Sequence, residues 1–352
     1  MLTSLNKVII YAQDSFNIEF AKTAIGFIKY GLCKTVAIID RKSAGKTANE
    51  IVSGLPEVPI FASLSEAKLK NPDADVLLIG IAIGGGKFPD EWIPDMISAL
   101  NLKLNIVNGL HDFLNEIRSL SELANKNHLW IWDVRQYKEK YLLANAKLLN
   151  IPMEIVLTVG TDGAIGKMTV SLELVKSAKL KNLNCAFVAT GQTGMMISGA
   201  GVPIDAITGD FMAGAIEKEL LRVAEKGYKL AFVEGQGSIL HPAWSGVTLG
   251  LLHGALPHKL VLCHKADREF LKNTNVKIQS LNQFVKAYED ISLPLRKAKV
   301  VSVALNTYGL SQKDADNAIR KAEDETGLPA DDPVRSSGDK ILNSILDFSM
   351  KK

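Results

Sequence analysis

The residues best suited to chemistry form one loop near the middle of the chain. It follows an apolar run and opens a helical pattern, which is the context of a phosphate-binding loop, or P-loop. Its sequence is Gly160-Thr161-Asp162-Gly163-Ala164-Ile165-Gly166-Lys167-Met168-Thr169. Glycines let the backbone amides face phosphate oxygens, while the helix N-terminus and Lys167 supply positive charge. We therefore expect these ten residues to bind a phosphate-bearing ligand. The alternative is a structural turn with an exposed lysine.

The loop departs from the strict P-loop pattern at two positions. The pattern begins with glycine, where this chain has Thr161 preceded by Gly160, and it places serine or threonine after the lysine, where this chain has Met168. A hydroxyl at that second position normally coordinates Mg²⁺. Thr169 cannot replace it, because it lies about 100° further around the helix. We therefore predict phosphate binding that depends little on Mg²⁺, and no protein-bound metal.

Three residues further along the chain are candidates for catalysis. Glu234 ends the apolar run 229–233, and a carboxylate at such a strand end, downstream of a P-loop, is typical of a metal-facing or base-like group. His241 lies in the loop that follows and could exchange protons near neutral pH. Asp205 is the third candidate. The alternatives are a surface carboxylate for Glu234 and a structural histidine at position 241.

Four residues are candidates for binding the substrate. Gly191 and Gln192 follow the expected strand 184–190, and Gln236 lies in the glycine-flanked loop after Glu234. A substrate carboxylate would also need a cation, and Arg135 supplies one near the expected connector between two domains.

The elements that must position these residues fall into two series in which strands and helices alternate. In the first series we expect strands at 8–12, 35–40, 75–82 and 104–107, and helices at 17–30 and 90–101. This alternation predicts an α/β fold with a Rossmann-like parallel sheet over residues 1–135. The loops 84–86 and 108–112 end two of these strands, where ligands bind in such sheets. Asp40 could accept a ribose hydroxyl, but no glycine fingerprint follows the first strand.

A helix rich in Lys, Ala and Leu is expected at 136–149 and would connect the domains, so that the connector covers 136–150. The second series then predicts a P-loop NTPase-like α/β domain over 151–352. Its expected strands are 154–159, 184–190, 229–234, 259–264 and 299–305. Its expected helices are 166–179, 210–226, 281–288 and 311–326.

The composition excludes several classes of protein. The 352 residues carry a net charge of +3 and are 47% hydrophobic, which is enough apolar material for two cores and indicates no basic surface for nucleic acid. No apolar run approaches the length of a membrane span. We expect no signal peptide, because an apolar strand follows the first few residues directly, and no disulfide framework from three scattered cysteines. We expect a soluble, cytoplasmic protein.

Long motifs in this chain resemble those of the D-glutamate N-acetyltransferase family, long known as a domain of unknown function with a P-loop. They are GTDGAIGKMT, ATGQTG, GVPIDAITGDFMAGAIE and VEGQGSILHPAWSGVTLGLLHG, with IGIAIGGGKFP and NGLH in the first domain. More distantly, the P-loop and VEGxG resemble dethiobiotin synthetase and related ATP-dependent ligases. By position, Lys167 and Glu234 correspond to the P-loop lysine and the VEGxG glutamate of these ligases. Met168 stands where the ligases have a metal-binding threonine.

The resemblance implies an N-acetyltransferase that uses acetyl-coenzyme A and acts on a small amino acid, such as D-glutamate or another D-amino acid. Coenzyme A carries phosphates that a P-loop can bind, and acetyl transfer moves no γ-phosphate. The Ser or Thr hydroxyl that coordinates Mg²⁺ can therefore be absent. Glu234 or His241 would be the base, and amides of the glycine loops would stabilise the oxyanion. The alternatives are an ATP-dependent ligase or kinase, and a non-catalytic nucleotide-binding protein. We also expect a homo-oligomer whose partners are small molecules, not nucleic acid or membrane.

Overall fold

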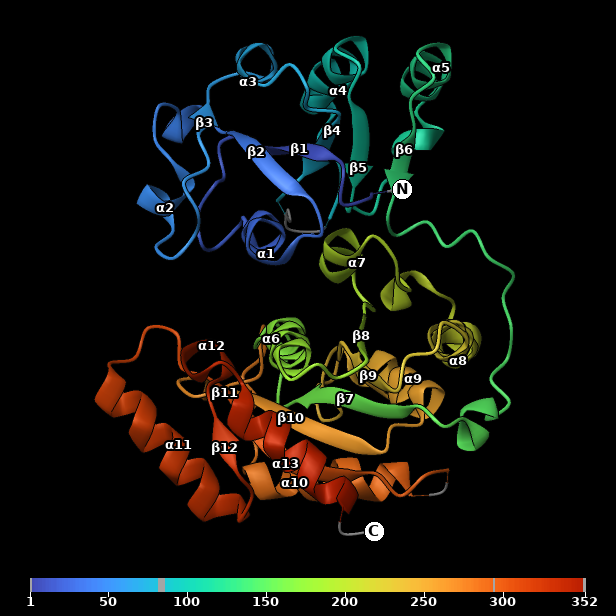
Figure 1. Cartoon of the computed structure of the whole chain (residues 1–352), viewed down its shortest axis with the longest axis vertical. Helices are drawn as coiled ribbons and strands as arrows, with labels where there is room; N and C mark the ends of the chain where they lie inside the picture. The colour runs from blue at the N-terminus through green and yellow to red at the C-terminus, as the bar shows by residue number, and fades with distance from the viewer. Residues whose placement is uncertain (1, 82–85, 294, 351–352) are drawn as a thin grey trace. The chain divides into compact units, whose positions relative to one another are not determined.

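The protein is described by a computed structural model that covers residues 2–81, 86–293 and 295–350. The chain divides into two compact units, each built on its own sheet (Figure 1). The N-terminal unit comprises Met1–Lys138 together with Gln192–Pro203, and the C-terminal unit comprises Glu139–Gly191 and Ile204–Lys352. The return of residues 192–203 to the N-terminal unit was not expected from the sequence.

The N-terminal unit contains a six-stranded parallel sheet in the order β3-β2-β1-β4-β5-β6. This is the strand order of the Rossmann fold, so the Rossmann-like prediction is confirmed. The strands are short, buried and rich in Val, Ile and Leu, as expected for a sheet covered on both faces. They are β1 Lys7–Tyr11, β2 Lys34–Ile39, β3 Ile60–Phe61, β4 Val76–Ile79, β5 Asn105–Asn108 and β6 Ile131–Asp133.

Helices cover both faces of this sheet. Helices α3, α4 and α5 lie on one face, and α1 and α7 lie together on the other (Figure 1). Their bounds are α1 Lys22–Tyr30, α2 Ala48–Ile51, α3 Leu64–Lys70, α4 Ile93–Asn101, α5 Arg118–Lys126 and α7 Gln192–Ser198. The helix expected from residue 17 begins only at Lys22. Residues 84 and 85 of the predicted glycine loop lie outside the described residues.

The C-terminal unit contains a second six-stranded parallel sheet, in the order β12-β11-β10-β7-β9-β8. Its strands are β7 Glu154–Gly160, β8 Cys185–Val188, β9 Leu230–Val233, β10 Lys259–Lys265, β11 Lys299–Asn306 and β12 Ala330–Asp331. Its helices are α6 Lys167–Leu180, α8 Gly209–Glu225, α9 Ser245–Ala255, α10 Leu281–Ser292, α11 Gln312–Thr326, α12 Pro333–Ser336 and α13 Asp339–Met350. The predicted P-loop α/β domain is therefore confirmed.

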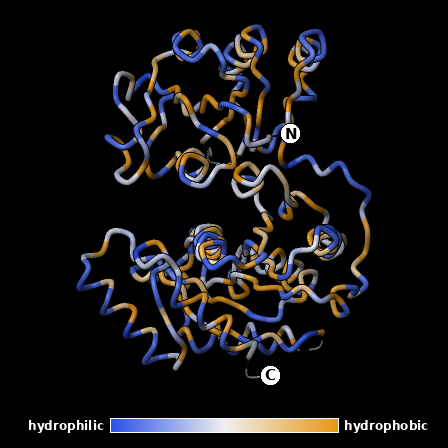
Figure 2. The backbone as a smooth tube through the Cα atoms, in the orientation of Figure 1, coloured by the Kyte–Doolittle hydropathy of each residue, from blue (hydrophilic) through white to orange (hydrophobic). Residues whose placement is uncertain are grey.

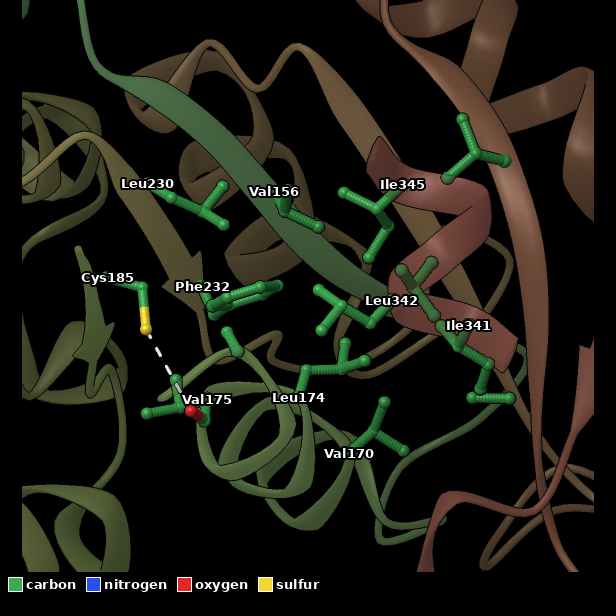
Figure 3. Close-up of a cluster of buried hydrophobic side chains, with 14 of the residues drawn as sticks. Val156, Val170, Leu174, Val175, Cys185, Leu230, Phe232, Ile341, Leu342 and Ile345 are labelled. Carbon is green, nitrogen blue, oxygen red and sulfur yellow. Dashed lines mark hydrogen bonds between the residues drawn. The ribbon is translucent and has the colours of Figure 1, made fainter. Parts of the chain in front are cut away.

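The core of the C-terminal unit holds the strand that precedes the P-loop. Val156 of β7 and Phe232 of β9 pack against Leu174 of α6 and against Ile341 and Ile345 of α13 (Figure 3). Figure 2 shows the buried strands as largely hydrophobic, whereas α11 is mostly hydrophilic. Because both β7 and α6 are fixed in this core, the loop that joins them has a rigid support on each side.

The helix predicted at 136–149 is wrong. Residues 136–146 form no helix, and a 3-10 turn at Lys147–Asn150 is the only helical part of the predicted connector. The segment lies against α8, where a Cβ added at Gly214 would be 1.8 Å from the carbonyl oxygen of Leu142. The buried Glu217 carboxylate accepts the backbone amides of Asn145 and Lys147 at 3.0 and 2.7 Å. These contacts with α8 take the place of helical hydrogen bonds. Within the described part of the chain, no helix is both long and apolar enough to span a membrane.

Candidate phosphate-binding and catalytic site

The predicted P-loop joins the end of β7 to the start of α6. Strand β7 ends at Gly160, and α6 begins at Lys167, so the intervening residues turn between a parallel strand and a helix N-terminus. Gly166 caps the helix with a φ of 110°, which a side chain would disfavour. Met168 and Thr169 lie half-buried in the first turn of α6. This is the strand-to-helix context that anion binding requires.

Lys167 is buried within the loop that it serves. Its Nζ donates to the carbonyl oxygen of Asp162 at 2.7 Å. A Cβ added at Gly160 would lie 3.1 Å from this Nζ, and one added at Gly235 would lie 3.0 Å from the lysine Cδ. Both glycines therefore make room for the lysine side chain. Burial lowers the pKa of Lys167 to about 8, against the opposing effect of nearby acidic groups that include Asp162 and Glu234.

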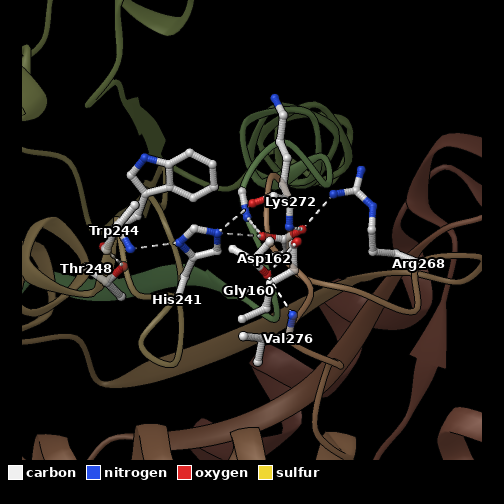
Figure 4. Close-up of polar contacts among 12 residues, drawn as sticks. Gly160, Asp162, His241, Trp244, Thr248, Arg268, Lys272 and Val276 are labelled. Carbon is white, nitrogen blue, oxygen red and sulfur yellow. Dashed lines mark hydrogen bonds and ion pairs between the residues drawn. The ribbon is translucent and has the colours of Figure 1, made fainter.

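The carboxylate of Asp162 is also buried, and it fastens a distant loop to the P-loop. Its Oδ2 accepts Nη1 of Arg268 at 2.6 Å and the backbone amide of Lys272 at 2.9 Å, while Oδ1 accepts the amide of Gly163 at 2.7 Å (Figure 4). With both oxygens used in this way, the side chain positions the loop. A ligand at the P-loop would meet the backbone of Asp162 and not its carboxylate.

His241, predicted as a possible general base, is buried with both ring nitrogens engaged. Its Nδ1 accepts the backbone amide of Ala243 at 3.1 Å, so Nε2 carries the proton and donates to the carbonyl oxygen of Lys272 at 3.0 Å. The ring stacks on Trp244, with centroids 4.0 Å apart. Neither nitrogen is free to take a proton from a substrate. The geometry therefore supports a positioning role for His241 in place of the role of base.

Glu234 directly follows β9, with only 5% of its surface exposed. Its Oε2 accepts the backbone amides of Thr190 at 3.0 Å and Gly191 at 3.2 Å. Burial raises the pKa of Glu234 to about 7, although the two amides and Lys167 act in the opposite direction. A carboxyl group with a pKa near 7 can accept and release a proton at neutral pH, as a general base must.

Two of the predicted substrate-binding residues lie beside Glu234. A Cβ added at Gly191 would be 3.4 Å from Oε1 of Glu234 and 2.7 Å from Nε2 of Gln236. Gln236 in turn donates to the hydroxyl of Thr190 at 3.1 Å. Asp205 is exposed and lies in the 3-10 turn Ile204–Ala206, and its charge contributes to the raised pKa of Glu234. The structure thus brings Glu234, Gly191 and Gln236 together, and Asp205 acts on Glu234 only through its charge.

The other two predicted substrate-binding residues lie in the N-terminal unit. Gln192 begins α7, and its side chain lies against Gly109, with 3.3 Å between its Cγ and a Cβ added there. Arg135 is buried and donates from Nε to the carbonyl oxygen of the same Gly109 at 2.9 Å. Arg135 and Gln192 therefore meet around one glycine, at the loop that follows β5.

Sequence reasoning missed residues that hold the P-loop from a distance. The hydroxyl of Tyr288 donates to the carbonyl oxygen of Gly160 at 2.8 Å and accepts the amide of Ile239 at 3.0 Å. Burial raises the pKa of Tyr288 to about 12. The hydroxyl of Thr161 bonds to Nδ1 of His264 at 2.9 Å. No local pattern marks Tyr288, because its partner lies 128 positions away in the chain.

Comparison with known proteins agrees with this architecture. Residues 142–342 match the family model "Domain of unknown function (DUF1611_C) P-loop domain", and residues 41–137 match "Domain of unknown function (DUF1611_N) Rossmann-like domain". A crystal structure of a DUF1611 family protein from Anabaena variabilis has a TM-score of 0.92 and 38% identity to this chain, and the match covers 97% of this chain and 99% of that one.

Two relatives carry the name D-glutamate N-acetyltransferase. The relative from Tritonibacter scottomollicae is 32% identical over 343 residues, which is 96% of this chain and 97% of the relative. The relative from a Pseudoalteromonas species is 35% identical over 279 residues, which is 77% of this chain and 81% of the relative. The resemblance found in the sequence motifs is thereby confirmed, and the chain belongs to the DUF1611 family.

Proposed function

We propose that the protein is an N-acetyltransferase that moves the acetyl group of acetyl-coenzyme A to the amino group of a small amino acid, with D-glutamate as the first substrate to test. The names of the two relatives support N-acetyl transfer. The observation that carries the mechanism is the buried Glu234 carboxyl group, whose pKa is raised to about 7 and which interacts electrostatically with the P-loop Lys167.

The P-loop would hold the diphosphate of coenzyme A. Its amides and the N-terminus of α6 offer partial positive charge, and Lys167 adds a full charge. A lysine whose pKa is about 8 is mostly protonated at pH 7, and a phosphate beside it would favour the protonated form further. The ammonium group would then exchange its bond to the carbonyl oxygen of Asp162 for bonds to phosphate oxygens.

Glu234 would take the proton that the attacking amine must lose. The amine nitrogen forms a bond to the thioester carbonyl carbon while a proton passes from nitrogen to the carboxylate. The C–S bond then breaks, and the proton that Glu234 accepted goes to the leaving thiolate, so that coenzyme A leaves as a free thiol. Among the described residues no hydrogen bond reaches Oε1 of Glu234, which leaves this oxygen for the amine.

The competing function is that of an ATP-dependent ligase or kinase, since Lys167 and Glu234 occupy the positions expected there as well. Such an enzyme normally needs the magnesium-binding hydroxyl that follows the P-loop lysine. Met168 fills that position with an apolar side chain in the first turn of α6. We therefore favour a phosphate-bearing substrate whose phosphates are bound and not transferred.

The test is release of free thiol from acetyl-coenzyme A with a panel of D- and L-amino acids, run beside a parallel assay for ATP hydrolysis. We expect thiol release with at least one amino acid and no ATP hydrolysis that depends on an amino acid. Glu234→Gln should lower kcat by about 10²–10⁴-fold. Lys167→Ala should chiefly raise KM for acetyl-coenzyme A, because its contact is made equally before and in the transition state.

Glu225→Gln is the matched control, because this exposed glutamate at the end of α8 lies outside the site. It should leave both kinetic constants unchanged. Absence of thiol release with every amino acid, from folded protein that binds coenzyme A, would refute the proposal. Thiol release that is unaffected by Glu234→Gln would leave the reaction in place and remove Glu234 as the base.

A further inference from the structure

Two cationic side chains, those of Arg268 and Lys272, come from the loop that Asp162 fastens to the P-loop. Arg268 uses Nη1 to neutralise the buried Asp162 carboxylate, and no other hydrogen bond of its guanidinium group is found among the described residues. Lys272 binds the same carboxylate through its backbone amide, so its side chain is not required for that contact. Within the described ranges the ammonium group of Lys272 has no hydrogen bond and no ion pair.

The direction of the Lys272 side chain indicates that its ammonium group is placed to bind a ligand. Figure 4 shows the side chain running away from Asp162, with its ammonium group at the far end, and in this view it stands between Trp244 and Arg268. The half-buried side chain thus extends away from the carboxylate that its own backbone amide binds. Because Arg268 already balances Asp162, the positive charge of Lys272 is available to a ligand.

An aromatic ring adjoins the same loop. The indole of Trp244 packs on Gly163, where an added Cβ would lie 2.5 Å from the ring. His241 stacks on the indole and fixes its orientation. The P-loop is therefore flanked by an aromatic surface and by two cations beyond Lys167. A nucleotide that carries a further phosphate in addition to its diphosphate matches this arrangement. Its base can lie on the aromatic ring, its diphosphate can bind the P-loop, and its further phosphate can bind the two cations.

From these contacts we infer that Lys272 and the outer edge of Arg268 form a second anion subsite, which binds the 3′-phosphate on the ribose of coenzyme A. The inference rests on the proposed function, since it assumes that the diphosphate of coenzyme A occupies the P-loop. It goes further because it names Lys272 as the residue that distinguishes coenzyme A from nucleotides without a 3′-phosphate. ATP and dephospho-coenzyme A would leave the subsite unfilled.

Isothermal titration calorimetry with coenzyme A and with 3′-dephospho-coenzyme A tests the subsite without requiring turnover. We expect the wild-type protein to bind coenzyme A about tenfold or more tightly than the dephosphorylated form, as one charge-assisted contact would give. Lys272→Met should weaken coenzyme A binding by about the same factor and leave binding of the dephosphorylated form within about twofold. The backbone contact to Asp162 survives in this variant, so the P-loop should keep its shape.

Lys277→Met is the control, because Lys277 lies in the same loop with an exposed side chain, and we expect it to change neither affinity. Adenosine 3′,5′-bisphosphate and adenosine 5′-phosphate should repeat the contrast without the pantetheine arm. Equal wild-type affinity for the two forms of coenzyme A, or an equal loss of both in Lys272→Met, would overturn the subsite while leaving acetyl transfer intact. Failure of the protein to bind either form would overturn the subsite and the proposed function together.

Discussion

Replacing Glu234 with glutamine should make the protein more stable above pH 7. Glutamine can keep both amide hydrogen bonds through its carbonyl oxygen, but it never carries the charge that burial disfavours. The wild-type carboxyl group has a pKa of about 7 in the folded protein against an ordinary value of 4.5. At about 1.4 kcal/mol per pH unit, this difference corresponds to about 3 kcal/mol.

The sign of the pH dependence follows from the direction of the change. A group whose pKa is higher in the folded state binds its proton more tightly there, so its favourable contribution is complete below pH 4.5 and is lost as the pH rises to 7. The wild-type protein should therefore lose stability over this range relative to Glu234→Gln. The difference between the two proteins should grow from near zero at pH 4.5 to about 3 kcal/mol above pH 7.

Urea unfolding of both proteins at several pH values between 5 and 8, followed by circular dichroism, measures this difference. Since the chain has two units, the comparison uses the transition that shifts on substitution. Glu225→Gln controls for removal of one negative charge from the C-terminal unit. A difference that stays constant across the pH range would refute the reasoning. It would mean that Glu234 ionises as an ordinary glutamate and is not tuned to act as a base near pH 7.

Three further results are expected. Addition of EDTA should weaken coenzyme A binding in calorimetry by less than tenfold, that is, by less than about 1.4 kcal/mol. A larger loss of affinity would favour the ligase function. Tyr288→Phe removes three hydrogen bonds of a buried hydroxyl and should lower the free energy of unfolding by about 1–3 kcal/mol, measured in urea, whereas an unchanged value would show that the Tyr288 hydroxyl does not stabilise the P-loop. Gly235→Ala would place a Cβ 1.7 Å from the carbonyl oxygen of Thr158, so thermal unfolding should reveal strong destabilisation, while Gly246→Ala has open space and should be tolerated.

The parts of the fold that were predicted correctly depend on signals that are local in the sequence. The run before Gly160 is a buried strand because its apolar residues are continuous, and the glycines and Lys167 after it match a loop whose geometry follows from neighbouring residues. The place of Glu234 at the end of β9 follows from the same kind of local signal, an acidic residue after an apolar run.

The parts that were missed depend on partners far away in the chain. The segment 136–146 has helix-forming residues, but contacts with Gly214 and Glu217 of α8 hold it in a non-helical conformation. His241 looked available for catalysis because its partner, the carbonyl oxygen of Lys272, lies 31 positions further on. Such tertiary contacts override local propensity and leave no mark in a single sequence.

The path of the chain through α7 also sets the order in which the protein can fold during synthesis. The N-terminal unit includes Gln192–Pro203. In this segment the carbonyl oxygen of Ile197 accepts the amide of Leu32, and the side chain of Met196 packs on Gly109. A ribosome must therefore release more than fifty residues of the second unit before the first can be completed. A nascent chain that ends at residue 138 would leave the side of α1 that packs on α7 uncovered. Proteolytic fragments cut between residues 139 and 191 should stay associated through α7 only if the full length has first been made.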